Sequence, residues 1–171
     1  MHGGPTRGRP TNATTVVHQD SVLVAVERRN ALAVAWYDAP QPGHLLTLLR
    51  LMQETHARAG ALTCLLQVIV RGTPRFAEEV RSEGVQMVRG SAKCTAASAH
   101  VIELSGLAGV ATRAFISTAL LVGRSRAPAK VFKEVQEAAP WYAQQLAANG
   151  TRFTTADVEE LYRVLKSHGP V

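Results

Sequence analysis

Two arginines flank a short polar turn near the middle of the chain, in the segment Arg71-Gly72-Thr73-Pro74-Arg75. Guanidinium groups bind carboxylates and phosphates through paired hydrogen bonds, and a helix that begins after this turn adds the partial positive charge of its first amides. We predict that Arg71, Gly72, Thr73 and Arg75 bind an acidic or phosphorylated partner. The alternative is purely structural, because threonine followed by proline is a common helix start.

A second candidate site follows the apolar run that ends at Leu104, where Ser105 and Gly106 open a turn into a helix. Free amides at a helix start attract anions. Ser105, Gly106, Gly109 and Arg113 are therefore candidate ligand-binding residues. The Gly-x-Ser-x-Gly motif of serine hydrolases is missing, and so are the glycine motifs of nucleotide-binding loops. An ordinary turn is the alternative.

The remaining reactive residues form no recognisable catalytic or metal-binding pattern. The chain has only three aspartates, none at the end of a predicted central strand, and its six histidines include no pair at the spacing of a helical metal site. Cys64 and Cys94 have neither the number nor the spacing of a zinc site or a disulfide framework. We therefore expect no catalytic residues, no metal ion and no cofactor. The alternative, an enzyme of an unrecognised type, requires a pocket that contains His100, Glu103 or Arg113 with a perturbed pKa.

The composition predicts one globular domain with tails, because 171 residues bury one core but are few for two domains. A net charge of +6 suits an acidic partner, yet the 19 Lys and Arg residues are scattered and only 5% of the residues are aromatic, so we do not expect a nucleic-acid partner. The longest apolar stretch, 104–122, is interrupted by Arg113, which argues against a transmembrane segment. No secretory signal is visible, and the cytoplasm is the expected location.

The spacing of the apolar residues predicts an α/β order that begins with a β-hairpin. The expected strands are 22–28, 31–37, 62–70, 100–104 and 129–132, and the expected helices follow Gly43, Pro74, Ser105, Phe132 and Thr154. These elements predict a mixed sheet of about five strands with helices packed against it and one extra C-terminal helix. The Gly- and Pro-rich residues 1–20 are expected to be a disordered tail, residues 21–150 the α/β domain, and residues 151–171 a helical extension.

The helix after Ser105 is apolar over more of its circumference than a surface helix needs. The best stripe consists of Ala111, Ala114, Phe115, Thr118, Ala119 and Val122. Ile116, Leu120 and Leu121 lie outside it, so a further element is expected to cover them. The candidates are the C-terminal helix, which needs no further assumption, a second subunit and an apolar ligand. The apolar character of this helix is the one ground for including a homodimer among these candidates.

The order of elements resembles the STAS-like domains of anti-sigma-factor antagonists. The ending, Val131-Phe132 followed by a helix that contains Ala138 and Trp141, is similar to the SpoIIAA-like branch of that family. This resemblance covers residues 21–148. It implies a non-enzymatic domain that acts by binding partners, and some relatives are thought to bind nucleotides or lipids. In phosphorylatable members a serine follows an aspartate at the place of Thr73, but the chain has no Asp-Ser pair there.

Taken together, the sequence predicts a regulatory or scaffold domain that binds a protein partner, which the sequence does not name, around Arg71–Arg75. The alternative is a protein that binds a small ligand, either an apolar molecule beside the helix after Ser105 or an anion at Ser105–Gly109. An enzyme is the least favoured of the three.

Overall fold

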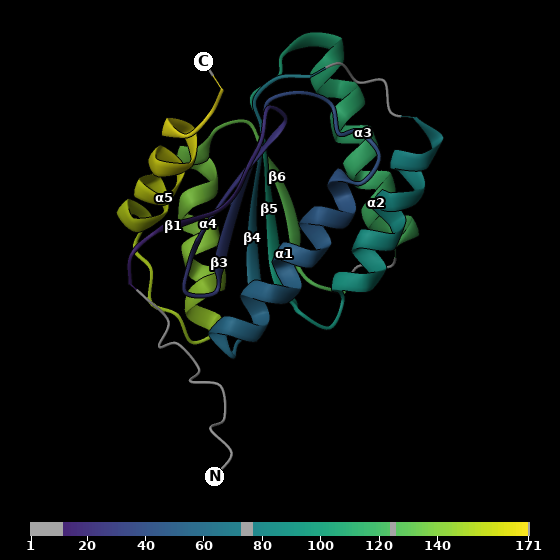
Figure 1. Ribbon diagram of the computed structural model, residues 1–171. Helices are drawn as coiled ribbons and strands as arrows, with labels where there is room; N and C mark the ends of the chain where they lie inside the picture. The colour runs from purple at the N-terminus through teal and green to yellow at the C-terminus, as the bar shows by residue number, and fades with distance from the viewer. Residues whose placement is uncertain (1–11, 73–76, 124–125, 171) are drawn as a thin grey trace.

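The computed structural model describes residues 12–72, 77–123 and 126–170. A six-stranded mixed sheet in the order β1-β2-β3-β4-β5-β6 forms its centre (Figure 1). β1 and β2 are antiparallel to their neighbours, whereas β3, β4, β5 and β6 run parallel. The strands are β1 Thr15–Gln19, β2 Leu23–Arg28, β3 Ala31–Trp36, β4 Thr63–Ile69, β5 Thr95–Ile102 and β6 Ala129–Phe132. The helices are α1 His44–Ala59, α2 Glu78–Ser91, α3 Gly106–Val122, α4 Val135–Ala148 and α5 Thr155–Ser167.

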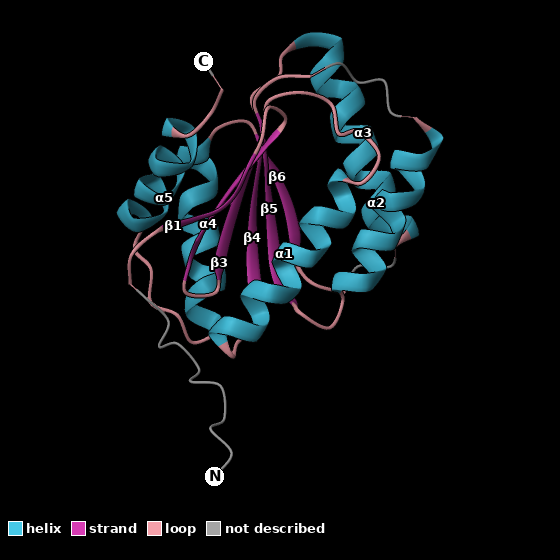
Figure 2. Ribbon diagram, viewed as in Figure 1, coloured by secondary structure: helices cyan, strands magenta, loops and turns pink. Residues whose placement is uncertain are grey.

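The helices form two layers, with α1, α2 and α3 on one face of the sheet and α4 and α5 on the other (Figure 2). Along β4, Leu66 and Val68 point to the α4 and α5 layer, and Leu65 and Ile69 point to the α1, α2 and α3 layer. Every residue of β4 is therefore buried. This explains the nearly continuous apolar run of the strand, since a central parallel strand is covered on both faces.

Most predicted elements are confirmed. α1 ends at Gly60, which adopts the left-handed conformation with φ 65°, as a glycine readily does after a helix. The capping box at the start of α5 is present, with the Thr154 and Asp157 side chains each accepting from the other's backbone N–H. α2 passes unbroken through Gly84 and α4 through Pro140, although glycine and proline both disfavour the interior of a helix. No helix in the described part of the chain is long and apolar enough to cross a membrane.

The sheet has one strand more than expected. Residues 15–19 were assigned to a disordered tail, but they form β1, which pairs antiparallel with β2. The prediction is wrong there because the strand is short and its neighbours along the chain are glycine, proline and threonine. Residues 1–11 lie outside the described residues. β5 also begins five residues earlier than predicted, since pairing with β4 recruits small residues such as Ala96 and Ala97 that have little strand preference of their own.

α5 does not cover α3, which corrects the simplest expectation from the sequence. α5 lies on the opposite face of the sheet, where Val158, Leu161 and Leu165 join the core with β2, β3 and α4. The predicted stripe of α3 is also not the face that the helix buries. α3 buries Gly109, Thr112 and Ile116 against the sheet layer, while Ala114, Thr118 and Val122 stay exposed. A second subunit and an apolar ligand remain as candidates to cover α3.

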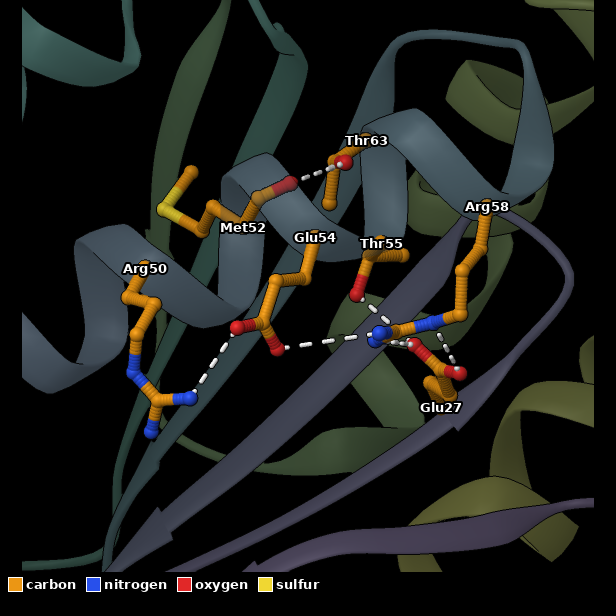
Figure 3. A network of polar contacts seen from close by, with 7 residues as sticks. All are labelled: Glu27, Arg50, Met52, Glu54, Thr55, Arg58 and Thr63. Atoms are coloured by element: carbon orange, nitrogen blue, oxygen red, sulfur yellow. Dashed lines mark hydrogen bonds and ion pairs between the residues drawn. The ribbon is translucent and has the colours of Figure 1, made fainter. Parts of the chain in front are cut away.

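A polar network fixes α1 to β2 (Figure 3). The Glu27 carboxylate of β2 accepts hydrogen bonds from Nε and NH2 of Arg58, at 2.9 and 2.7 Å, and from Oγ1 of Thr55 at 2.8 Å. Oγ1 of Thr63, the first residue of β4, donates to the carbonyl oxygen of Met52 at 3.0 Å. These contacts hold the C-terminal half of α1 on the sheet. Because the helix is rigid, they also fix the position of its first turn, near the carboxyl ends of the parallel strands.

Candidate ligand-binding site

The carboxyl ends of three parallel strands meet at one edge of the sheet. Trp36 of β3 pairs with Ile69 of β4, and Ile69 pairs with Ile102 of β5. In open α/β sheets this edge is where ligands bind. Here the sheet is extended in one direction only and α1, α2 and α3 all cross on the same face, so the strands do not part to form a crevice at this edge. The space for a ligand must therefore lie between the sheet and the helices.

Such a space exists beneath α1 and α3. We call it the Gln67 pocket, and its cavity volume is about 40 Å³. Its walls are apolar side chains from both helices and from the strand ends, together with the buried Thr112 of α3. Its lining consists of Trp36, Asp38, Ala39, Pro40, Leu45, Gln67, Ile69, Arg71, Gly72, Leu104, Thr112, Phe115 and Ile116. Known sites for small molecules are likewise mostly apolar concavities with a few polar groups, although they are usually larger.

Gln67 supplies the polar group on the sheet side of this pocket. It stands between Leu65 and Ile69 on the same face of β4, and only 8% of its surface is exposed. Its Oε1 is buried and accepts no hydrogen bond from any described residue. An amide in this position loses contact with bulk water without gaining a protein partner.

Trp36 contributes a second unpaired polar atom. The residue is 2% exposed, and its ring lies edge-on to the His44 ring, with 6.2 Å between the centroids. Its indole Nε1–H is buried and donates to no described residue. Trp36 pairs with Ile69, two residues beyond Gln67 on β4, so Trp36 and Gln67 are diagonal neighbours on one face of the sheet. The pocket lining thus combines an unused donor with an unused acceptor.

His100 lies next to Gln67 in the register of β4 and β5 but does not line the pocket. Its Nε2 lies 3.1 Å from Oγ of Ser98, and its Nδ1 has no partner among the described residues. Burial lowers the pKa of His100 to about 4, so the ring is neutral at pH 7. The imidazole therefore lies beside Gln67 on the neighbouring strand and adds no charge there.

The predicted partner-binding residues lie partly at the mouth of the pocket. Arg71 is exposed, and its Cζ lies 5.6 Å from the centroid of the Tyr37 ring. Gly72 has φ 135°, and a Cβ atom there would come within 2.8 Å of the backbone nitrogen of Ala39, so both conformation and space require glycine. Thr73 and Arg75, the other two predicted residues, lie outside the described residues.

The four predicted ligand-binding residues do not lie together at one site. Ser105, Gly106 and Arg113 line a second, more open cleft together with Glu103, Lys133, Glu134 and Tyr162. Gly109 instead packs against the end of β5, where a Cβ atom would collide with the carbonyl oxygen of Leu104, so this residue has a packing role. Ser105 precedes α3 without a side-chain capping bond.

The second cleft carries charges of both signs. Nζ of Lys166 donates to Oε2 of Glu103 at 2.8 Å, and the Tyr162 hydroxyl donates to Oε1 of the same carboxylate. Burial, and then the carboxylate of Glu103, raise the pKa of Tyr162. In the described lining Arg113 and Lys133 are balanced by Glu103 and Glu134, so this cleft has no net positive charge that would favour an anion. Within the described ranges, no three His, Cys, Asp or Glu side chains gather to hold a metal ion.

Comparison with protein-family models, curated proteins and solved structures gave no match to this chain.

Sequence reasoning missed the residues that form the Gln67 pocket. Gln67 interrupts an otherwise apolar segment, and this was the available signal, because a polar side chain in a central strand has to be paired. Trp36, Thr112 and Ile116 carried no comparable signal. Their places in the pocket depend on how α3 is turned about its own axis, and the apolar pattern of that helix favoured a different face.

Proposed function

We propose that this chain is a non-enzymatic domain that binds a small, mostly apolar molecule in the Gln67 pocket. The observation that supports this most is the unpaired amide of Gln67 in a wall that is mostly apolar. A buried polar group without a partner costs free energy, which a ligand with a complementary group recovers. The apolar surfaces of Ile69, Phe115 and Ile116 add the hydrophobic contribution.

The sequence alone favours partner binding around Arg71–Arg75 over ligand binding. We place ligand binding first. Arg71 is exposed and contacts the Tyr37 ring, so nothing about its surroundings singles out a protein partner. Its neighbour Gly72 belongs to the mouth of the Gln67 pocket. Partner binding at this place stays a prediction, as do the cytoplasmic location and the lack of a nucleic-acid partner.

We also propose that the fold is of the STAS-like, SpoIIAA-like kind. The residues that carry the resemblance fit together: the rings of Phe132 and Trp141 pack at 5.8 Å between centroids, and Ala138 lies fully buried on the inner side of α4. The family resemblance implies a domain without catalysis, which agrees with the ligand-binding proposal.

A titration with toluene, followed by NMR of the ¹⁵N-labelled protein, tests the proposed function. We expect signals from residues around the Gln67 pocket to shift on addition of toluene. Leu104→Phe fills space at the pocket wall and should abolish these shifts, whereas Leu46→Phe, at a 42% exposed position of α1, should leave them unchanged. Identical spectra with and without toluene in the unmodified protein would rule the proposal out.

A second candidate function is association through α3. Four large apolar side chains of this helix are exposed: Leu107 is 88% exposed, Leu121 79%, Val110 56% and Val122 47%. Exposed apolar patches mark interaction surfaces, and a second copy of the chain is the partner that the sequence predicts. Light scattering coupled to size-exclusion chromatography should then show a dimer that Leu121→Glu dissociates and Leu46→Glu does not. A monomer at every concentration would eliminate this candidate.

A further inference from the structure

Gln67 and Trp36 differ from the other residues that hold buried, unpaired polar atoms. Arg28, Asn30, Glu83 and His100 each have one such atom, but a second polar atom of the same side chain has a partner within 3.2 Å. In the described part of the chain, Gln67 and Trp36 are the two residues of this group whose side chains make no hydrogen bond at all. Both line the same pocket.

From this coincidence we infer the chemical class of the ligand: a neutral, mostly apolar molecule that inserts one carboxamide or lactam group between Gln67 and Trp36. The inference rests on the proposed function, since it describes what the Gln67 pocket recognises. A carboxamide offers an N–H to Oε1 of Gln67 and a carbonyl oxygen to Nε1–H of Trp36. The carbonyl oxygen has two lone pairs, so it also accepts from the amide nitrogen of Gln67.

The distribution of charge explains why the inserted group is neutral. Among the described residues of the pocket lining, the ionisable ones are Asp38 and Arg71, and both are exposed. The described residues of the interior offer no counter-charge for a carboxylate or an ammonium group, since the neighbouring His100 is also uncharged at pH 7. A charged group would lose its hydration there without gaining an ion pair.

The apolar walls of the pocket determine the chemistry of the rest of the ligand, outside its carboxamide group. Leu45, Ile69, Leu104, Phe115 and Ile116 surround the space next to Gln67. An aromatic or branched aliphatic group beside the carboxamide satisfies these walls, and it removes apolar surface from water on both sides. A small amide without such a group would gain little by binding, because its two hydrogen bonds in the pocket only replace hydrogen bonds that it already makes with water.

Three probes of similar size separate the possibilities: benzamide, toluene and benzoate. Binding is followed through the indole N–H signals of the two tryptophans, Trp36 and Trp141, which Trp141→Phe assigns. We expect benzamide to bind and to move the Trp36 signal downfield, as a new hydrogen bond does, whereas toluene binds without this shift. Benzoate should bind at least tenfold more weakly than benzamide.

Gln67→Leu provides the decisive comparison. It should weaken benzamide by about tenfold, the effect of losing a buried hydrogen bond, and leave toluene unchanged or tighter. Gln67→Met, which is closer to glutamine in shape, should do the same, so a packing defect is not mistaken for a lost hydrogen bond. Gln144→Leu, on the exposed side of α4, should alter neither probe.

Several outcomes overturn the inference while the proposed function stands. These are toluene binding without benzamide binding, benzoate binding as tightly as benzamide, and equal loss of toluene and benzamide in Gln67→Leu. The first of them would mean that a trapped water satisfies Gln67 and is not displaced. If none of the three probes binds, both the inference and the proposed function fail.

Discussion

Replacing Gln67 with methionine should stabilise the ligand-free protein, although it removes a residue of the proposed binding site. The glutamine side chain is 8% exposed, and its Oε1 has no partner among the described residues. Leaving a buried polar group unpaired costs about 1–3 kcal/mol. Methionine has a similar length and shape, carries no group that needs a hydrogen bond, and adapts to irregular gaps. Since the residue retains some contact with the pocket space, we expect a gain of about 1–2 kcal/mol in the free energy of unfolding.

Urea denaturation followed by circular dichroism measures this gain. The midpoint should rise with an unchanged slope, because the surface exposed on unfolding stays the same. For a chain of this size the melting temperature should rise by about 2–4 °C per kcal/mol. Gln144→Met, at an exposed position of α4, is the matched control and should change the free energy by less than about 0.5 kcal/mol. A less stable Gln67→Met variant would refute the reasoning, since it would mean that Gln67 is well paired in the free protein.

Three further predictions concern stability. Burial lowers the pKa of His100 from 6.5 to about 4, so below pH 6.5 the unfolded chain binds the proton more readily, and the free energy of unfolding should fall by up to about 3 kcal/mol by pH 4. Urea denaturation at several pH values should show a smaller fall for His100→Leu, and an identical fall would contradict the assignment. Glu27→Gln weakens the contacts with Arg58 and Thr55 and should cost about 1–2 kcal/mol, whereas Arg50→Gln, which loses only an exposed pair with Glu54, should cost less than about 0.5 kcal/mol; equal losses would be evidence against the network. Tyr142→Phe removes a fully buried hydrogen bond of 2.5 Å to the carbonyl oxygen of Cys64 and should cost about 1–2 kcal/mol in the same assay, and an unchanged midpoint would mean that this bond adds no net stability.

The strands that sequence reasoning found are those whose residues favour strands on their own. β2, β3 and β4 each contain valine and leucine in apolar runs long enough to be recognised, and β6 was predicted with its observed bounds. The first half of β5, from Thr95 to Ala99, could not be recognised in this way. Its small side chains form a strand because β4 on one side and β6 on the other supply hydrogen bonds, which is a property of the sheet and not of the segment.

The orientation of α3 shows a second limit. An apolar residue stripe predicts the buried face only where the rest of the helix is polar, and α3 has apolar or small residues nearly all round. The close approach of Gly109 to the carbonyl oxygen of Leu104 turns Thr112 and Ile116 toward the sheet instead. The spacing of apolar residues along the sequence does not reveal individual contacts of this kind. The pocket, which needs α3 in this orientation, could therefore not be predicted as a whole, and only its polar residue Gln67 left a trace in the sequence.

Three departures from the rules of a stable interior coincide in the Gln67 pocket. An amide without a partner stands in a central strand, an indole N–H beside it has no acceptor, and the apolar walls enclose unfilled space. Each departure costs free energy on its own, and an apolar side chain at position 67 would remove the first of them without disturbing the alternation of Leu65 and Ile69. Departures from local rules are expected at functional sites, where they are compensated by something other than packing. A single molecule with a donor, an acceptor and an apolar body compensates all three together, and its binding free energy adds to the stability of the folded chain. This is why the stability gained by Gln67→Met and the affinity lost by Gln67→Leu should have one origin.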